Sequence, residues 1–212
     1  MQTLKPDGYF THQSALFFHG LTQSPPTNIY LNFEQQMAST PGSTLDQTVV
    51  DRVFKNKPRT TNYLTDCDGH NVYVLNGRQT GRLGVVRQPV EQVTQSTTAI
   101  QFTTLSRTLI DCTVRPAYAG RAITVAEAFK RAKGQVDPRE IARMLLKLAY
   151  AYPYHQCIGF YLEHAGYAPA ECEVFRKMPT KIDFYLENQI VRPTHNKKWR
   201  LHVPRSLVSG PS

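Results

Sequence analysis

Apolar and polar positions alternate over short runs in the first half of the chain, whereas the second half has helical spacing. Residues 29–33 and 99–103 have the pattern of strands. Residues 62–65 and 71–75 flank Asp68-Gly69, which predicts a hairpin because both turn residues tolerate positive φ. The first half is therefore expected to form a small, mostly antiparallel sheet.

Two segments of this half have a helical pattern instead. Apolar residues between positions 8 and 21 recur at helical spacing, and Gly20 can help to end that helix. Residues 44–54 also place their apolar side chains on one side. Between them, Pro25-Pro26 interrupt regular structure and the small polar residues 38–44 predict a loop.

The second half opens with a short amphipathic helix over residues 105–111. Arg107 and Asp111 lie at i and i+4 in it, and Pro116 and Gly120 stop it. A buried structural ion pair is the favoured interpretation of these two residues. Direct contact of the pair with a ligand is the alternative.

Capping residues predict the helices that follow. Thr124 and Glu127 have the spacing of a capping box, and Gly134 is placed to close that helix. Asp137 precedes Pro138, and proline is favoured at the first position of a helix. Further helices are expected over residues 154–165 and from Pro169 to about position 178.

The pattern changes once more near the end of the chain. Residues 183–187 and 199–203 alternate and predict a late hairpin, while residues 205–212 are expected to be disordered. Together the elements predict an α+β fold with a helical second half. We expect one domain over residues 9–204, β-richer over 9–104 and helical and basic over 105–204, after an N-terminal extension, 1–8.

Positive charge is concentrated in the second half. The chain has 25 Lys and Arg against 16 Asp and Glu, a formal net charge of +9. Residues 1–104 contribute +1 to this total and residues 105–212 contribute +8. Such asymmetry indicates nucleic acid or another acidic partner. A solvated face that keeps the protein in solution is the alternative.

The helix predicted from Pro138 gives the clearest candidate site. Its residues Arg139, Arg143 and Lys147 fall at i, i+4 and i+8, a spacing suited to a row of phosphates. Local pairing with Glu140 or Asp137 is the alternative. The complete set of candidate nucleic-acid-binding residues is Lys130, Arg131, Lys133, Arg139, Arg143, Lys147, Lys197, Lys198 and Arg200. Trp199, within the last group, is expected in the core rather than stacked on a base.

Cysteines and histidines indicate no metal site. None of the four cysteines forms a Cys-x-x-Cys pair, and Cys112 and Cys157 have apolar helical surroundings typical of buried thiols. Neither a signal peptide nor an apolar run of membrane-spanning length is visible. We therefore expect a cytoplasmic protein with reduced thiols, no metal, no cofactor and no membrane partner.

Motifs that indicate catalysis are weak. Gly42-Ser43 followed by Asp66 and Asp68 faintly resembles a nucleotidyltransferase pattern, but the gap is long and the Asp68-Gly69 turn is the better explanation. The chain contains no Gly-x-Ser-x-Gly, P-loop or His-Glu-x-x-His sequence. No enzymatic activity is expected.

Three blocks of sequence resemble the AbiEi-type antitoxin family, transcriptional regulators of bacterial abortive-infection (type IV) toxin–antitoxin systems. They are SAL…HGLT with IYL at residues 14–22 and 29–31, RTLID with RPAYAG at 107–111 and 115–120, and IGFYLE with WRL at 158–163 and 199–201. The chain differs from the family at Ser106, where an acidic residue is frequent, and at Arg121, where glycine is usual.

The resemblance implies the antitoxin domain of such a regulator. Many members have a winged-helix domain before the first block, whereas only residues 1–13 precede it here, so we expect no winged helix in this chain. The expected function is a non-catalytic antitoxin-like regulator that counters a nucleotidyltransferase-type toxin and contacts nucleic acid through its basic half. A DNA- or RNA-binding subunit of a multi-protein phage-defence assembly is the alternative.

Overall fold

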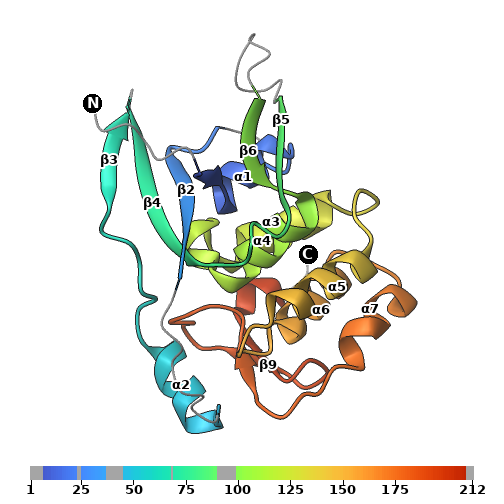
Figure 1. Ribbon diagram of the computed structural model, residues 1–212. Helices are drawn as coiled ribbons and strands as arrows, with labels where there is room; N and C mark the ends of the chain where they lie inside the picture. The colour runs from blue at the N-terminus through green and yellow to red at the C-terminus, as the bar shows by residue number, and fades with distance from the viewer. Residues whose placement is uncertain (1–6, 23–24, 37–44, 68, 90–98, 209–212) are drawn as a thin grey trace.

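The computed structural model describes residues 7–22, 25–36, 45–67, 69–89 and 99–208 (Figure 1). It has an α+β fold, as the sequence predicts, with a six-stranded sheet, a three-stranded sheet and seven α-helices in these ranges. The larger sheet occupies the upper part of the view in Figure 1, and helices α4–α7 lie below it. Helix α3 lies between the two parts.

The larger sheet is mixed, so the expectation of a mostly antiparallel sheet is only loosely met. Its strand order is β3-β4-β2-β1-β6-β5. The longest pairing, β2 with β4, is parallel over eight residue pairs, and β1 also pairs with β6 in parallel. The strands are β1 (Tyr9–Phe10), β2 (Asn28–Gln35), β3 (Leu64–Cys67), β4 (His70–Arg78), β5 (Val85–Pro89) and β6 (Ala99–Thr103).

Local signals in the first half are confirmed where they depend on neighbours in sequence. Strands β3 and β4 form the predicted antiparallel hairpin, although turn residue Asp68 lies outside the described residues, as does the whole of the loop expected at 38–44. The first helix, α1 (His12–Phe18), is shorter than predicted because Tyr9 and Phe10 join the sheet instead. Helix α2 (Gln47–Lys55) begins at Asp46, whose side chain accepts a hydrogen bond from the Val49 amide.

Helix α3 (Leu105–Val114) is the most buried helix near the sheet. The Thr104 side chain caps it by accepting a hydrogen bond from the Arg107 amide. Every residue from Ser106 to Thr113 is buried, including the two charged ones. The helix ends before a 3-10 turn at Pro116–Tyr118, as the proline predicts.

The capping box predicted at Thr124 is wrong. Helix α4 (Arg121–Arg131) has its N-cap four residues earlier, at Gly120, whose φ of 81° favours glycine. Thr124 lies in the first turn, and its hydroxyl donates a hydrogen bond to the Gly120 carbonyl. Gly134 has a φ of 82° after the end of this helix, which fits its expected closing role.

The next three helices begin close to where the sequence predicts them. Helix α5 (Pro138–Leu148) has Asp137 as its N-cap, accepting a hydrogen bond from the Arg139 amide. Helices α6 (Tyr154–His164) and α7 (Pro169–Arg176) follow. In each case a proline lies at or next to the first helical position. The N–H group that proline lacks would have no partner within the helix there, so no helical hydrogen bond is lost.

The predicted hairpin between residues 183–187 and 199–203 is wrong. Strand β7 (Phe184–Tyr185) pairs in parallel with β9 (Leu201–Val203), and the antiparallel partner of β9 is β8 (Thr194–Asn196). The tail expected to be disordered from residue 205 instead begins with a 3-10 turn at Arg205–Leu207. Leu207 is buried against the core, which gives this turn a reason to be ordered.

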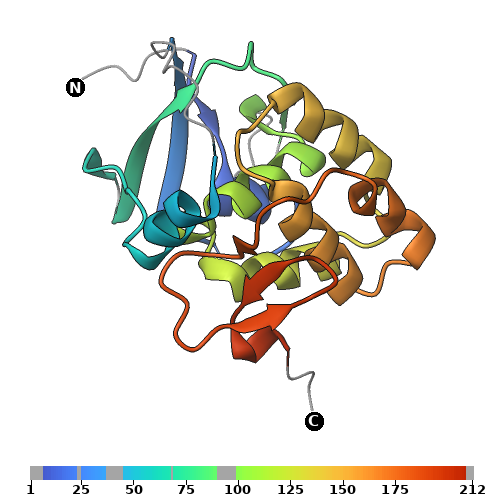
Figure 2. The ribbon, with the colours of Figure 1, turned by 90° about the horizontal axis from the view of Figure 1, so that it is seen from below.

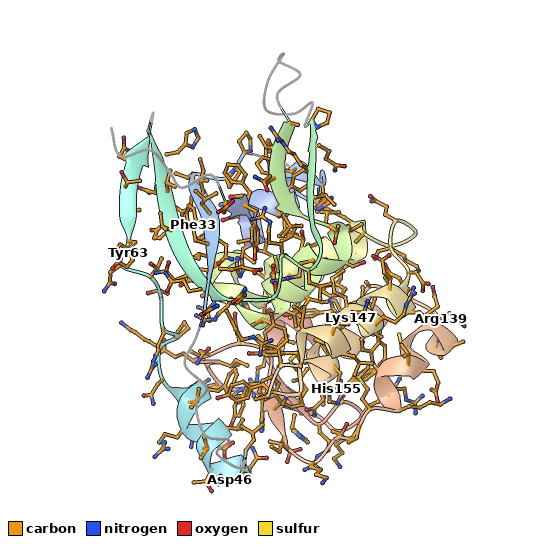
Figure 3. The ribbon with its side chains drawn as sticks, in the orientation of Figure 1. Phe33, Asp46, Tyr63, Arg139, Lys147 and His155 are labelled. Atoms are coloured by element: carbon orange, nitrogen blue, oxygen red, sulfur yellow. The ribbon has the colours of Figure 1, made fainter. Side chains whose placement is uncertain are left out.

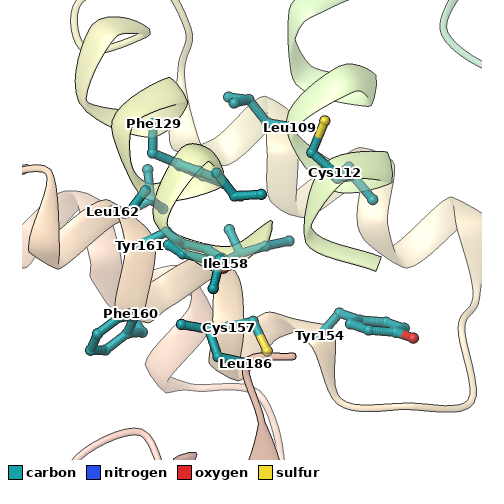
Figure 4. Close-up of a cluster of buried hydrophobic side chains, with 14 of the residues drawn as sticks. Leu109, Cys112, Phe129, Tyr154, Cys157, Ile158, Phe160, Tyr161, Leu162 and Leu186 are labelled. Atoms are coloured by element: carbon teal, nitrogen blue, oxygen red, sulfur yellow. The ribbon is translucent and has the colours of Figure 1, made fainter. Parts of the chain in front are cut away.

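One hydrophobic core joins both halves of the chain, from Leu16 to Leu207. Figure 4 shows its centre, where α6 packs against α3 and α4. The Phe129 and Tyr161 rings stack with centroids 5.1 Å apart. Cys112 and Cys157 are fully buried, as predicted. This core fixes the orientation of α3 and α5, which hold the candidate functional residues.

Candidate functional site

Helix α5 presents a row of cations to solvent. Arg139, Arg143 and Lys147 are all exposed, and Figure 3 shows Arg139 and Lys147 near opposite ends of the helix. None of the three forms an ion pair with a residue that the structure describes. The local pairing with Glu140 or Asp137 is therefore not formed, and the row lies open to an anionic partner.

The apolar face of α5 explains this orientation. Ile141, Leu145 and Leu148 are buried in the core, so the opposite face must point outward. Among the described residues, the Arg143 guanidinium forms one hydrogen bond, of 3.3 Å from Nε to the Arg139 carbonyl. Because the row points outward and its arginine side chains form no ion pair with a described carboxylate, its charges can interact with an anionic partner.

The cations at the end of α4 lie close in sequence to the start of α5. Lys130 and Arg131 are exposed in the last turn of α4. Lys133 donates a hydrogen bond to the Gly166 carbonyl and lies 5.9 Å from the centroid of the Tyr167 ring. The connection from α4 to α5 therefore adds two exposed cations beside the row and one that packs on the protein itself.

The cations around Trp199 are differently placed. Lys198 pairs with Glu163, and Arg200 Nε lies 2.9 Å from Asp183 Oδ1, so neighbouring carboxylates offset both charges. Trp199 is only 3% exposed, which confirms its expected core role and leaves no ring face for a base. Lys197 remains exposed on the turn before it.

The predicted basic residues therefore do not form one surface. Helix α5 faces the viewer in Figure 1, whereas the small sheet with its turn at residues 197–200 faces the viewer in Figure 2. Lys133 and Lys198 nevertheless both reach the C-terminal end of α6, at the Gly166 carbonyl and at Glu163.

Arg107 and Asp111 form a buried ion pair in α3. Arg107 Nε lies 2.7 Å from Asp111 Oδ1, with side-chain exposures of 6% and 8%. Thr11 donates a 2.9 Å hydrogen bond to the other carboxylate oxygen, and Arg107 Nη1 donates one of 2.6 Å to the Leu83 carbonyl. Burial alone would lower the pKa of the Arg107 guanidinium. The charge and the hydrogen bond of the Asp111 carboxylate together outweigh burial and raise this pKa. The pair thus links α3 to two segments at the sheet.

The same two side chains lie in the wall of a cavity of about 560 Å³ between the larger sheet and α3. Buried residues of its inner wall include Tyr9, His12 and Asn32. Exposed arginines, Arg59, Arg78 and Arg115, lie where it meets solvent. The cavity is within the size range of small-molecule and cofactor sites.

A carboxylate behind the inner wall holds the sheet side of the cavity in place. Glu34 accepts hydrogen bonds from the Tyr9 hydroxyl at 3.1 Å, from the Thr80 amide at 2.9 Å and from the Arg82 amide at 3.1 Å. Burial alone would raise the pKa of Glu34, but these hydrogen bonds outweigh it and lower the pKa. An ionised Glu34 therefore ties β2 to the segment after β4.

His12 is the most unusual residue of the cavity wall. Its φ of 52° lies in the left-handed region, which is uncommon for a residue other than glycine. Its Nδ1 is buried and has no hydrogen-bond partner among the described residues. Burial lowers the pKa of the imidazole to about 4, so the ring is neutral near pH 7. Strained residues of this kind are concentrated at functional sites.

Sequence reasoning missed most of this cavity. Arg59 follows α2, Arg78 ends β4 and Arg115 follows α3, so no spacing along the chain relates them. Of the cavity residues, the sequence indicates only Arg107 and Asp111 as candidates, with a structural role favoured and direct contact with a ligand as the alternative. A solitary histidine such as His12 gives no signal in a sequence without its neighbours in space.

Other chemistry-bearing residues remain dispersed. Among the described residues, no group of three His, Cys, Asp or Glu side chains could hold a metal ion. Asp66 is exposed on β3, whereas Asp68 and Gly42-Ser43 lie outside the described residues. The nucleotidyltransferase pattern is therefore not seen as an assembled site in this part of the chain. No described helix combines the length and apolarity needed to cross a membrane.

Comparisons with known proteins bear on the fold alone. No protein-family model matches the chain, and no curated protein matches it. The crystal structure of the RV2827C protein from Mycobacterium tuberculosis is similar, with a TM-score of 0.59 and 14% sequence identity. The match covers 94% of this chain and 63% of the mycobacterial chain, so this chain spans less than two thirds of that protein's length. The similarity supports the α+β architecture.

Proposed function

We propose that the chain is a non-catalytic, antitoxin-like regulator of a bacterial phage-defence or mobile-element locus, acting in the cytoplasm. In this proposal it counters a nucleotidyltransferase-type toxin and contacts nucleic acid through α5. The observation that supports the nucleic-acid contact best is the row Arg139, Arg143 and Lys147, exposed and without ion pairs to described residues.

The geometry of the row suits a phosphate backbone. Successive cations four residues apart on a helix are separated by about 6 Å along its axis. Each cation that neutralises a phosphate releases a condensed counterion, which favours binding at low salt. A cation already paired with a carboxylate releases less, so the unpaired state of Arg139, Arg143 and Lys147 increases their expected contribution.

Position 121 is one of the two places where the chain differs from the antitoxin family. Arg121 has a φ of 73°, a conformation that favours glycine, and glycine is the residue usual there in that family. In this chain Arg121 Nη2 lies 2.9 Å from Glu187 Oε1, and Glu187 also accepts a hydrogen bond from the Ala122 amide. The ion pair gives a local reason for arginine in an unfavourable backbone conformation.

A second candidate function is a DNA- or RNA-binding subunit of a multi-protein defence assembly. One observation favours it: Leu146, within the α5 row, is 65% exposed. An exposed leucine among cations offers an apolar contact to a protein partner as well as a charged one to nucleic acid. The two functions share the α5 surface and differ in whether a toxin is countered.

Co-expression distinguishes these functions. The chain would be induced in a bacterial host together with a nucleotidyltransferase-type toxin from a type IV system, and growth recorded. Restored growth is expected from the antitoxin function. Absence of rescue by well-expressed, folded chain would contradict that function and favour the assembly subunit.

The non-catalytic part of the proposal has its own test. The purified chain would be incubated with labelled nucleoside triphosphates, magnesium and RNA, beside a variant with Asp66→Asn and Asp68→Asn. No label transfer is expected from either protein. Transfer by the parent chain that disappears in the double variant would establish an enzyme instead.

A further inference from the structure

The arginines that line the cavity beside α3 carry more positive charge than its carboxylate offsets. Four arginines line it, Arg59, Arg78, Arg107 and Arg115, whereas Asp111 is the single carboxylate in its wall among the described residues. Arg107 already offsets Asp111 through the buried ion pair. The other three arginines form no ion pair with a described residue. An anion is therefore the ligand charge that the cavity favours.

Two of these arginines are oriented by backbone carbonyls. Arg115 Nη1 donates a 2.9 Å hydrogen bond to the Arg59 carbonyl. Arg78 Nη2 donates to the carbonyl of Leu148 at the end of α5, and its guanidinium lies 5.7 Å from the Tyr150 ring centroid. A guanidinium has five N–H donors, so each keeps donors for a ligand after these contacts. A guanidinium held in one orientation presents paired N–H donors, which are suited to phosphate oxygens.

Aromatic rings lie beside the arginines. Tyr118 and Tyr150 line the cavity, and Tyr63 lines it from the residue before β3, with 68% of its surface exposed (Figure 3). The Tyr118 hydroxyl accepts a 2.9 Å hydrogen bond from the Thr61 amide, which fixes the segment before β3 against the cavity. An exposed tyrosine at the opening of a basic cavity is suited to stack on a nucleobase.

His12 forms part of the inner wall and is neutral near pH 7. Its ring packs against Tyr118 with centroids 5.3 Å apart. A neutral ring adds no charge at this position, so the excess positive charge of the cavity comes from its arginines.

We propose that this cavity binds a nucleoside phosphate, with the phosphate at Arg78 and Arg115 and the base against Tyr63. A volume of about 560 Å³ accommodates a ligand of that size. The inference goes beyond the antitoxin function and does not depend on it. The nucleoside phosphate is either a free nucleotide or the terminal nucleotide of a strand, and both present the same chemistry to the cavity.

Calorimetric titration of the full chain tests the proposal. The probes are the four ribonucleoside monophosphates, ATP, adenosine, inorganic phosphate, and a short oligonucleotide with or without a 5′-phosphate. At least one nucleoside phosphate should bind saturably, and more tightly than adenosine or inorganic phosphate. Tighter binding of the 5′-phosphorylated oligonucleotide than of both its unphosphorylated form and the monophosphates would identify a strand end as the source, and tighter binding of a monophosphate than of either oligonucleotide would identify a free nucleotide.

Matched variants assign the binding to the cavity. The double variant Arg78→Gln and Arg115→Gln, and separately Tyr63→Ala, should each weaken nucleotide binding by about tenfold or more. All three side chains are exposed, so the variants should still fold, which melting curves would confirm. Arg87→Gln, exposed on β5 and outside the cavity, is the control and should bind the nucleotide normally.

Two results would overturn the proposal. One is the absence of saturable binding of any nucleoside phosphate at millimolar concentration. The other is binding that inorganic phosphate matches, or that the Arg78, Arg115 and Tyr63 variants leave unchanged. Loss of DNA binding by α5 variants with nucleotide binding intact would affect only the proposed function, so the two failures are distinguishable.

Discussion

Arg107 Nε lies 2.7 Å from Asp111 Oδ1 in the wall of the cavity beside α3, and both side chains are less than a tenth exposed. The other oxygen of Asp111 accepts a hydrogen bond from Thr11, and Arg107 also donates to the Leu83 carbonyl. Each charge is thus matched within the protein. The pair positions α3 against the sheet and leaves the anion-binding capacity of the cavity to the exposed arginines.

Removal of the carboxylate should strongly destabilise the fold. Asp111→Ala leaves the Arg107 guanidinium buried without its counter-charge, for which we expect a loss of about 3–5 kcal/mol in the free energy of unfolding. Chemical denaturation measures this loss. The matched control is Glu173→Ala in the exposed i, i+3 pair Arg176–Glu173, whose N–O distance is 3.6 Å.

The exposed pair should contribute less than about 1 kcal/mol, because solvent screens it and side-chain entropy opposes it. Equal losses for Asp111→Ala and Glu173→Ala would contradict the structural role of the buried pair. An Asp111→Ala protein that is as stable as the parent but loses nucleotide binding would instead identify the carboxylate as part of a ligand site.

Burial of His12 should make the fold sensitive to acid. Its pKa is lowered from 6.5 to about 4, so between these values the unfolded chain binds a proton that the folded chain does not. Stability from this residue is therefore complete above pH 6.5 and decreases as the pH falls toward 4, by about 3 kcal/mol in total.

His12→Asn isolates this contribution, because asparagine tolerates the left-handed backbone and does not titrate. Denaturation at several pH values should show a shallower acid loss for the variant than for the parent. Identical slopes in the two proteins would show that His12 does not titrate as a buried neutral imidazole.

A close contact inside the core gives a test of packing. A Cβ added at Gly159 would overlap the Trp199 ring. Alanine usually stabilises a helix relative to glycine, yet Gly159→Ala should destabilise the fold by about 1–3 kcal/mol because overpacking dominates. Thermal or chemical denaturation gives the sign directly.

The double-mutant cycle separates sterics from helix propensity. In a Trp199→Leu background the smaller side chain leaves room, so Gly159→Ala should become neutral or stabilising. The same loss in both backgrounds would contradict direct contact between these two positions.

Local signals predicted the parts of the fold that depend on residues adjacent in sequence. Asp137 before Pro138 marked the start of α5, and the apolar stripe of that helix predicted which face points outward. The prediction of a cap at Thr124 failed because the helix begins earlier, after Gly120 with its left-handed backbone. The sequence pattern could not distinguish these two starts, since either has residues suited to a helix N-terminus.

Pairing and clustering at long range could not be predicted in the same way. Strand β9 alternates as expected, but alternation says nothing about whether β7 pairs with it in parallel. The cavity is similar: Arg59, Arg78 and Arg115 meet only because β2 and β4 pair and α3 packs beside them. Such sites follow from topology, so the single chain gave no signal for them.

The proposed contact between α5 and nucleic acid requires a control for overall charge. Arg139→Gln, Arg143→Gln and Lys147→Gln together remove three charges from the row. Arg52→Gln, Lys55→Gln and Lys57→Gln remove three from exposed positions in and after α2. Both triple variants have the same net charge, so any difference between them reports position. Melting curves would confirm that both fold.

Duplex-DNA binding by the two triple variants, measured by fluorescence anisotropy over a salt series, tests the central claim most directly. The parent should bind at about 50 mM salt and lose affinity by orders of magnitude toward 200 mM. The α5 triple should weaken binding at low salt and reduce the slope of log K against log salt by about 3, whereas the α2 triple keeps the parent's slope. Equal effects of the two triples, or no binding by the parent at the lowest salt, would contradict the account.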